Sequence, residues 1–239
     1  MPKRVFSPFE TSDERSHFRA IMLAFCAMGF HVGVWAVLLA DLAGSLSLSP
    51  GVLGVALTCQ SAAGVVALLA GGRLADRFGR RPLLVAGVAG TGVYLALLAF
   101  VESYGALLAV LVFSGVVGLY DLACNALGGD HERQHDVKAM TLFHAGFSGS
   151  AALGAFGSGV ALSAGIGFGT VYVISGGGIL LFAFAATRLP LPRRVAETDG
   201  EESSRRTFDL LRVPAVLACV AIIFMCFSTD AALEGYTSI

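Results

Sequence analysis

The sequence predicts an all-α membrane protein, on the evidence of its composition, its apolar segments and the placement of its basic residues. Hydrophobic residues make up 56% of the chain and charged residues 14%, whereas charged residues make up roughly a quarter of an ordinary soluble domain. A helix needs about 20 apolar residues to cross the hydrocarbon core of a bilayer, because no water there can satisfy exposed backbone groups. Apolar runs of that kind recur along the chain.

Seven apolar segments are candidate membrane spans. They are expected at residues 20–42, 52–71, 82–101, 106–128, 140–164, 167–187 and 213–229. The first is interpreted as a retained span, because it is too long for the apolar core of a signal peptide and shows no small-residue cleavage site.

The basic residues indicate the orientation. All 16 Lys and Arg residues fall on one side of the predicted membrane, in residues 1–19 and in the connections after the second, fourth and sixth spans. The opposite connections, 41–51, 102–105 and 165–166, contain none. The positive-inside rule therefore predicts a multi-pass protein with a cytoplasmic N-terminus, and we expect it in a plasma membrane of the bacterial inner-membrane type. No nucleic-acid partner is expected, because the membrane already accounts for these dispersed arginines.

The expected organisation has four parts. Residues 1–19 form a cytoplasmic segment, 20–187 a six-span bundle, 188–212 a cytoplasmic linker, and 213–239 the first span of a truncated second bundle. The linker assignment rests on prolines and mixed charges in this stretch, including "RVAETDGEESSRR", which are typical of a connection between two units.

The loop between the second and third spans carries a charged pattern, "GRLADRFGRRPLL", at residues 72–84. This stretch resembles the signature of the major facilitator superfamily in the same loop. The matching positions are Gly72, Leu74, Asp76, Gly79, Arg80, Arg81 and Leu84. The resemblance implies the six-helix N-terminal bundle of such a transporter, built as a three-plus-three inverted repeat. It also implies that this loop, with Arg77, is a conformational gate. We expect Asp130, at the end of span four, to pair with Arg77 or Arg73 in that gate. A merely basic cytoplasmic turn is the alternative.

A second resemblance concerns the branch of the superfamily. Spans four and five, "GLYDLACNALGGDHER" and "TLFHAGFSGSAALGAFGSG", are similar to those of fucose-permease-like sugar:proton symporters. In that branch an acidic residue precedes an Asn by four positions in span four, as Asp121 precedes Asn125 here. Span five lacks the Gly-Pro pair found in many drug exporters, which disfavours that alternative.

Polar side chains within the spans are candidates for the substrate and proton pathway, because burying them in lipid is costly. The candidates are His31, Gln60, Asp121, Asn125 and His144. Asp121 and Asn125 share a helix face, and His144 lies at a depth at which it could meet Asp121. Asp121 is the candidate proton-binding group. For each candidate, a structural hydrogen bond between helices is the alternative.

The predicted function is therefore secondary active transport of a small polar solute, a sugar or similar metabolite, coupled to protons. Alternatives are proton-coupled efflux of drugs or metabolites and a truncated membrane module that does not transport. No enzyme, cofactor or metal site is predicted, because Asp121, Asn125 and His144 lack an activated Ser or Cys with recognisable spacing and no cysteine pair is spaced like a zinc or haem motif. Expected partners are the solute, protons, the lipid bilayer, and the missing C-terminal half or a second copy of the chain.

Overall fold

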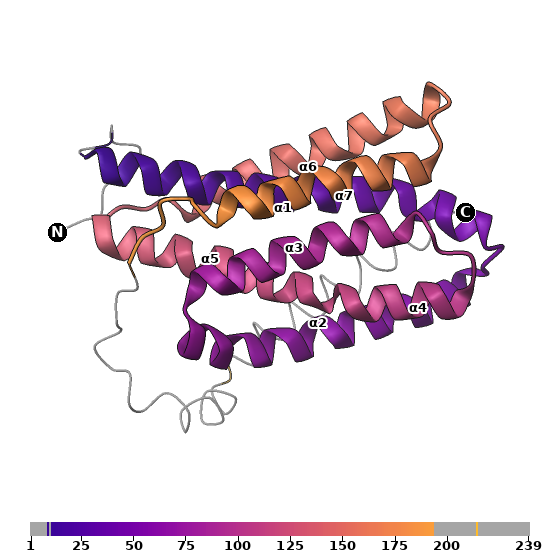
Figure 1. Cartoon of the computed structure of the whole chain (residues 1–239), viewed down its shortest axis with the longest axis horizontal. Helices are drawn as coiled ribbons and strands as arrows, with labels where there is room; N and C mark the ends of the chain where they lie inside the picture. The colour runs from indigo at the N-terminus through magenta and orange to yellow at the C-terminus, as the bar shows by residue number, and fades with distance from the viewer. Residues whose placement is uncertain (1–8, 10, 194–213, 215–239) are drawn as a thin grey trace. The chain divides into compact units, whose positions relative to one another are not determined.

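The computed structural model describes residue 9, residues 11–193 and residue 214. The chain divides into two compact units, Met1–Arg194 and Val195–Ile239, and the account below concerns the first. Its elements are α1 (Ser12–Ser45), α2 (Pro50–Phe78), α3 (Arg80–Leu98), α4 (Tyr104–Phe113), the 3₁₀ turn η1 (Ser114–Val116), α5 (Val117–His135), α6 (Met140–Ser163) and α7 (Phe168–Ala186). The described residues contain no strand (Figure 1).

Six of the predicted spans are confirmed. In the described residues, six helical segments are long and apolar enough to cross a membrane, with α4, η1 and α5 together forming the fourth, Tyr104–His135. The predicted seventh span, 213–229, lies outside the described residues apart from residue 214. The all-α class therefore holds throughout the bundle.

Two helices extend well beyond their predicted apolar limits. α1 begins at Ser12, where the side chain of Thr11 accepts a hydrogen bond from the Glu14 N–H and two acidic residues occupy the first turn. Both features stabilise a helix N-terminus. Residues 1–19 were predicted as a cytoplasmic segment before the first span, and residues 12–19 of this segment belong to α1. α2 likewise continues through most of the charged pattern, to Phe78.

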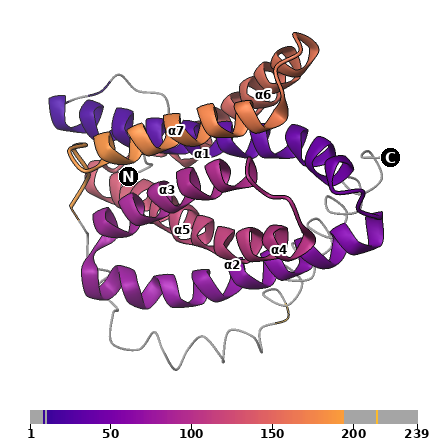
Figure 2. The ribbon, with the colours of Figure 1, turned by 45° about the vertical axis from the view of Figure 1, so that its right-hand side comes forward.

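The helices pair in a pattern that relates the two halves of the bundle. α1 packs most extensively on α6, α3 packs on α7, and α2 packs along α4, η1 and α5 (Figures 1 and 2). In terms of spans, these pairs are one with five, three with six, and two with four. Exchanging spans one to three for spans four to six converts the first pair into the last and leaves the middle pair unchanged. This is the pairing expected of a three-plus-three repeat.

Glycines allow the closest helix pairs to form. A Cβ atom at Gly33 of α1 would overlap the backbone of Ala151 in α6, and one at Gly154 of α6 would overlap the backbone of Phe30. A Cβ atom at Gly176 of α7 would approach the carbonyl oxygen of Gly92 in α3 to 2.7 Å. Small residues are a recurring means of bringing helix backbones together in membranes.

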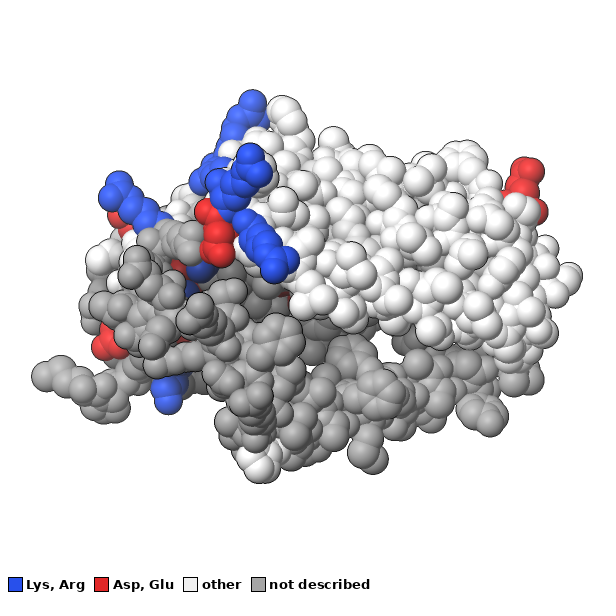
Figure 3. Space-filling model, turned by 90° about the horizontal axis from the view of Figure 1, so that it is seen from below, with Lys and Arg blue, Asp and Glu red and all other residues white. Residues whose placement is uncertain are grey.

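The surface of the bundle is apolar between two polar ends. Large side chains such as Phe156 of α6 and Leu181 of α7 are 72% and 75% exposed, as suits contact with lipid. In Figure 3, the visible Lys and Arg side chains gather at one end and an acidic side chain lies at the other. We call the first the basic end: it holds the start of α1 and the ends of α2, α5 and α7. Asp41 and Glu102 belong to the opposite end.

Candidate functional site

The charged pattern at the basic end is mostly helical. α2 and α3 are separated by Gly79 alone, with φ 86° and ψ 169°. That region of conformational space is open to glycine and closed to nearly every other residue. A Cβ atom at Gly79 would meet nothing within 4 Å, so the requirement for glycine is conformational. The predicted loop is thus a one-residue turn.

Two arginines after this turn connect α3 to other helices. Arg80 donates to the carbonyl oxygen of Ala126, at 2.5 Å, and to the carboxylate of Asp130, both on α5. Asp130 is fully buried, and its other oxygen accepts from Arg133 at 2.9 Å. Arg81 donates to the carbonyl oxygens of Thr187 and Leu189, each at 2.7 Å, at the end of α7.

The prediction that Asp130 pairs with Arg77 or Arg73 was wrong. The ion pairs shown with Asp130 involve Arg80 and Arg133, whereas Arg77 or Arg73 was predicted. Arg77 precedes the turn and its guanidinium lies 5.2 Å from the centre of the Phe78 ring. The turn at Gly79 separates the two arginines, so Arg77 packs beside its own helix and Arg80 reaches α5.

Three further residues of the pattern lie on the last turns of α2, and Leu84 is buried in α3. Leu74 is partly buried against the core cluster. Gly72 and Asp76 are exposed, and Asp76 takes part in a further interaction. The pattern therefore combines a packed leucine, an obligatory turn and arginine contacts with two other helices.

Asp121 and Asn125 lie together on α5, as predicted. The Asn125 amide donates to the Asp121 carboxylate and to the Asp121 backbone carbonyl, each at 3.0 Å. Both side chains are partly buried. The pair thus presents one carboxylate oriented by an amide at a partly accessible position within the bundle.

His144 lies near this pair, on α6. It is close enough to Asp121 for a coulombic interaction, although no hydrogen bond between the two is found in the described part of the chain. His144 is exposed, and its ring packs edge-on against Phe25 of α1, with centroids 5.3 Å apart. This arrangement is consistent with the prediction that Asp121 and His144 lie at similar depths in spans four and five.

His31 and Gln60 lie elsewhere, and each makes a local hydrogen bond. His31 is buried, and its Nδ1 lies 2.7 Å from the carbonyl oxygen of Met28 in the same helix. Gln60 of α2 donates to the hydroxyl of Ser114 in η1 at 3.0 Å, and that hydroxyl donates to the Leu111 carbonyl. Neither residue contacts the Asp121–Asn125 pair through a hydrogen bond in the described residues.

Comparison with known protein families identifies the fold. A family model described as Major Facilitator Superfamily matches residues 20–239. The chain belongs to the Major Facilitator Superfamily. A search of curated proteins gives no match. Membership agrees with the six confirmed spans. Members of this family are membrane transporters.

One cluster in this superfamily member was not anticipated. His17 of α1 and His131 and His135 of α5 meet at the basic end, with one ligand atom from each lying within 4.8 Å of the others. The spacing of four between the two histidines of α5 was a signal in the sequence. The third histidine lies 118 residues away in the chain, and no sequence pattern connected it to the other two.

Proposed function

We propose that this chain is the N-terminal half of a proton-coupled transporter for a small polar solute, such as a sugar, of the fucose-permease-like branch. The solute would reach a site between two bundles, which open alternately to either side of the membrane. In this proposal the basic end is cytoplasmic, residues 188–212 link the halves, and residues 213–239 begin the second bundle.

The Asp121–Asn125 pair is the observation that supports proton coupling. A carboxyl group in a partly apolar setting can gain and lose a proton as its surroundings change. Asn125 holds the Asp121 carboxylate with a hydrogen bond of 3.0 Å, and His144 adds a nearby imidazole. Protonation of Asp121 would weaken both interactions, and this links proton binding to the shape of the pathway.

The contacts of Arg80 and Arg81 support a role for the charged pattern in gating. They join the start of α3 to α5 and to the segment after α7. The turn at Gly79 is therefore fixed within its own bundle by contacts with two other helical segments. In this proposal Leu74 and Asp76 are part of the gate, together with the arginines.

The test is solute-driven proton movement in proteoliposomes, with monosaccharides and other small polar metabolites as candidate solutes. One set of vesicles contains this chain, and a second contains a twelve-span protein in which it is the N-terminal half. Each is compared with its Asp121→Asn variant. Asp136→Asn is the matched control, because Asp136 is exposed just beyond α5.

Loss of proton coupling in Asp121→Asn, with solute binding kept and Asp136→Asn unchanged, supports the proposal. Proton-coupled transport that persists in Asp121→Asn refutes the role of Asp121. Outward movement of apolar drugs in place of sugars favours the efflux alternative. Failure of every form to move any solute favours a membrane module that does not transport.

A further inference from the structure

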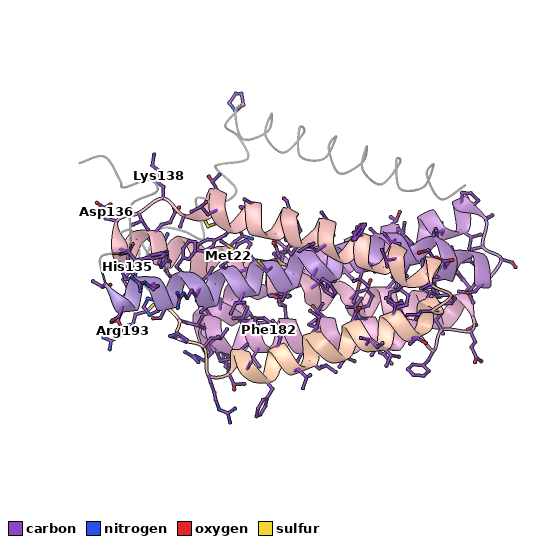
Figure 4. All side chains as sticks on the ribbon, turned by 90° about the horizontal axis from the view of Figure 1, so that it is seen from above. Met22, His135, Asp136, Lys138, Phe182 and Arg193 are labelled. Atoms are coloured by element: carbon purple, nitrogen blue, oxygen red, sulfur yellow. The ribbon has the colours of Figure 1, made fainter. Side chains whose placement is uncertain are left out.

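Three histidines meet where the first turns of α1 pass the last turn of α5. His131 and His135 are four residues apart and so lie on the same face of α5. Nδ1 of His17 lies 3.2 Å from Nε2 of His135, and the rings of His131 and His135 have centroids 4.9 Å apart. Figure 4 shows His135 at the basic end, near Asp136 and Lys138. Two helices distant in sequence thus bring three imidazoles together.

The distances match those of a metal site. Imidazole nitrogens bind Zn²⁺ at about 2.0–2.1 Å, which places two ligand nitrogens of a tetrahedral site roughly 3.3 Å apart. The His17–His135 distance of 3.2 Å already has this value. All three ligand atoms lie within 4.8 Å of one another, so side-chain rotations of modest size would complete the set.

The burial of His131 provides a second, independent observation. His131 is 1% exposed, and its Nδ1 has no hydrogen-bond partner among the described residues. A buried nitrogen without a partner is unfavourable, because it has given up its hydrogen bonds with water. The rings of Phe18 and Phe143 pack near His131, with centroids 6.1 and 6.0 Å away. This apolar wall holds the imidazole in place.

Two carboxylates near the cluster would help to hold a cation. Glu14 of α1, which is 3% exposed, and Glu132 of α5 both act electrostatically on His131. The Glu132 carboxylate is fixed by the backbone N–H groups of Ala139 and Met140, at 2.6 and 2.9 Å. Two carboxylates near three imidazoles would partly neutralise a divalent ion without themselves being ligands.

We propose that His17, His131 and His135 bind a divalent transition-metal ion of the zinc class, which joins the start of α1 to the end of α5. Three neutral imidazoles select zinc and similar ions over calcium and magnesium, which prefer oxygen ligands. The hydrogen bond between His17 and His135 is replaced by two metal–nitrogen bonds. Each imidazole stays neutral, with its proton on the ring nitrogen that faces away from the metal. The fourth position is left to water.

The first test is calorimetric titration of the tag-free chain in detergent with Zn²⁺. One ion per chain should bind, and Mg²⁺ and Ca²⁺ should not compete. His17→Gln and His135→Gln should each weaken binding by more than tenfold, because each removes one of three ligands. His144→Gln is the matched control, since it removes a histidine away from the cluster, and it should leave binding unchanged. Absence of zinc binding, or equal losses in His144→Gln, would overturn the proposal.

A second measurement uses the unaltered chain and so does not depend on the folding of the variants. A reagent that acylates neutral imidazole is applied with and without Zn²⁺, and each modified histidine is located by mass spectrometry. Zinc should protect His17 and His135 at least severalfold and leave His144 as reactive as before. Equal reactivity of His17 and His135 with and without the ion would refute the site. Neither measurement involves transport, so the outcome is separate from that of the proposed function.

Discussion

Replacing Asp130 with Asn tests how much the ion pairs at the basic end stabilise the bundle. Asp130 is fully buried and contacts two guanidinium groups, of Arg80 and Arg133, whose side chains are 17% and 35% exposed. Asn keeps the shape and one acceptor oxygen, but it removes the charge. The substitution therefore isolates the electrostatic part of the interaction.

The expected cost follows from these two contacts. A hydrogen bond to a charged group contributes about 1.5–3 kcal/mol when it is well buried, which applies to Arg80. The pair with Arg133 is more exposed and lies within one helix, so it contributes about 0.3–0.5 kcal/mol. Asp130→Asn should therefore lower the free energy of unfolding by about 2–3.5 kcal/mol. This corresponds to roughly a 30- to 350-fold change in the unfolding equilibrium constant.

The converse substitution, Arg80→Gln, should be more harmful. It removes one of the two guanidinium groups that contact the buried Asp130 carboxylate, and removing one member of a buried ion pair costs about 3–5 kcal/mol. The double variant should lose at least about 1 kcal/mol less free energy of unfolding than the two single losses added together, because it leaves no unpaired charge at either position.

The assay is reversible unfolding in mixed micelles as the denaturing detergent increases, followed by helical circular dichroism. Asp136→Asn is the control, and it should change the free energy of unfolding by less than about 0.5 kcal/mol. Asp136 is exposed and has φ 51° and ψ 45°, which Asn accepts readily. Simple additivity of Asp130→Asn and Arg80→Gln would refute the argument that these two residues stabilise the bundle as a pair.

Two further predictions concern glycines. Gly79→Ala should lower the free energy of unfolding by about 1–3 kcal/mol, because its φ of 86° strains a residue with a side chain; the same unfolding assay measures this, and no change would contradict the one-residue turn. Gly33→Val should separate α1 from α6, since even a Cβ atom there overlaps the Ala151 backbone. Disulfide cross-linking between engineered cysteines on α1 and α6 should fall relative to the same pair with Gly44→Val, where a Cβ atom meets nothing within 4 Å; equal cross-linking would count against the close packing.

The architecture was largely predictable because a bilayer imposes a length and a polarity on each span. Six of the seven apolar segments correspond to helices of the described bundle. The contact between Asp121 and Asn125 was also predictable, since residues four apart are neighbours on a helix. The ends of helices were harder to predict. Hydropathy locates the part of α1 that crosses the membrane, whereas Thr11 decides where the helix begins.

The sequence did not contain enough information to predict contacts that depend on how helices rotate and approach. Arg77 and Arg80 have the same chemistry, and their different neighbours follow from the turn at Gly79. His17 and His135 meet across 118 residues. His31, an obvious pathway candidate by composition, hydrogen-bonds its own helix. Residue spacing predicts which side chains are neighbours within one helix, but it does not predict which helices pack together.

The 3₁₀ turn in span four changes which residues share a face on its two sides. An α-helix advances about 100° per residue and a 3₁₀ helix about 120°. The turn Ser114–Val116 has 3 residues, so α5 is rotated by roughly 60° relative to an uninterrupted continuation of α4. A helical wheel drawn through Tyr104–His135 as one helix would place the residues of α5 on the wrong faces. Spin labels or lipid-facing probes on this span are therefore best positioned from two separate wheels, one for each side of the turn.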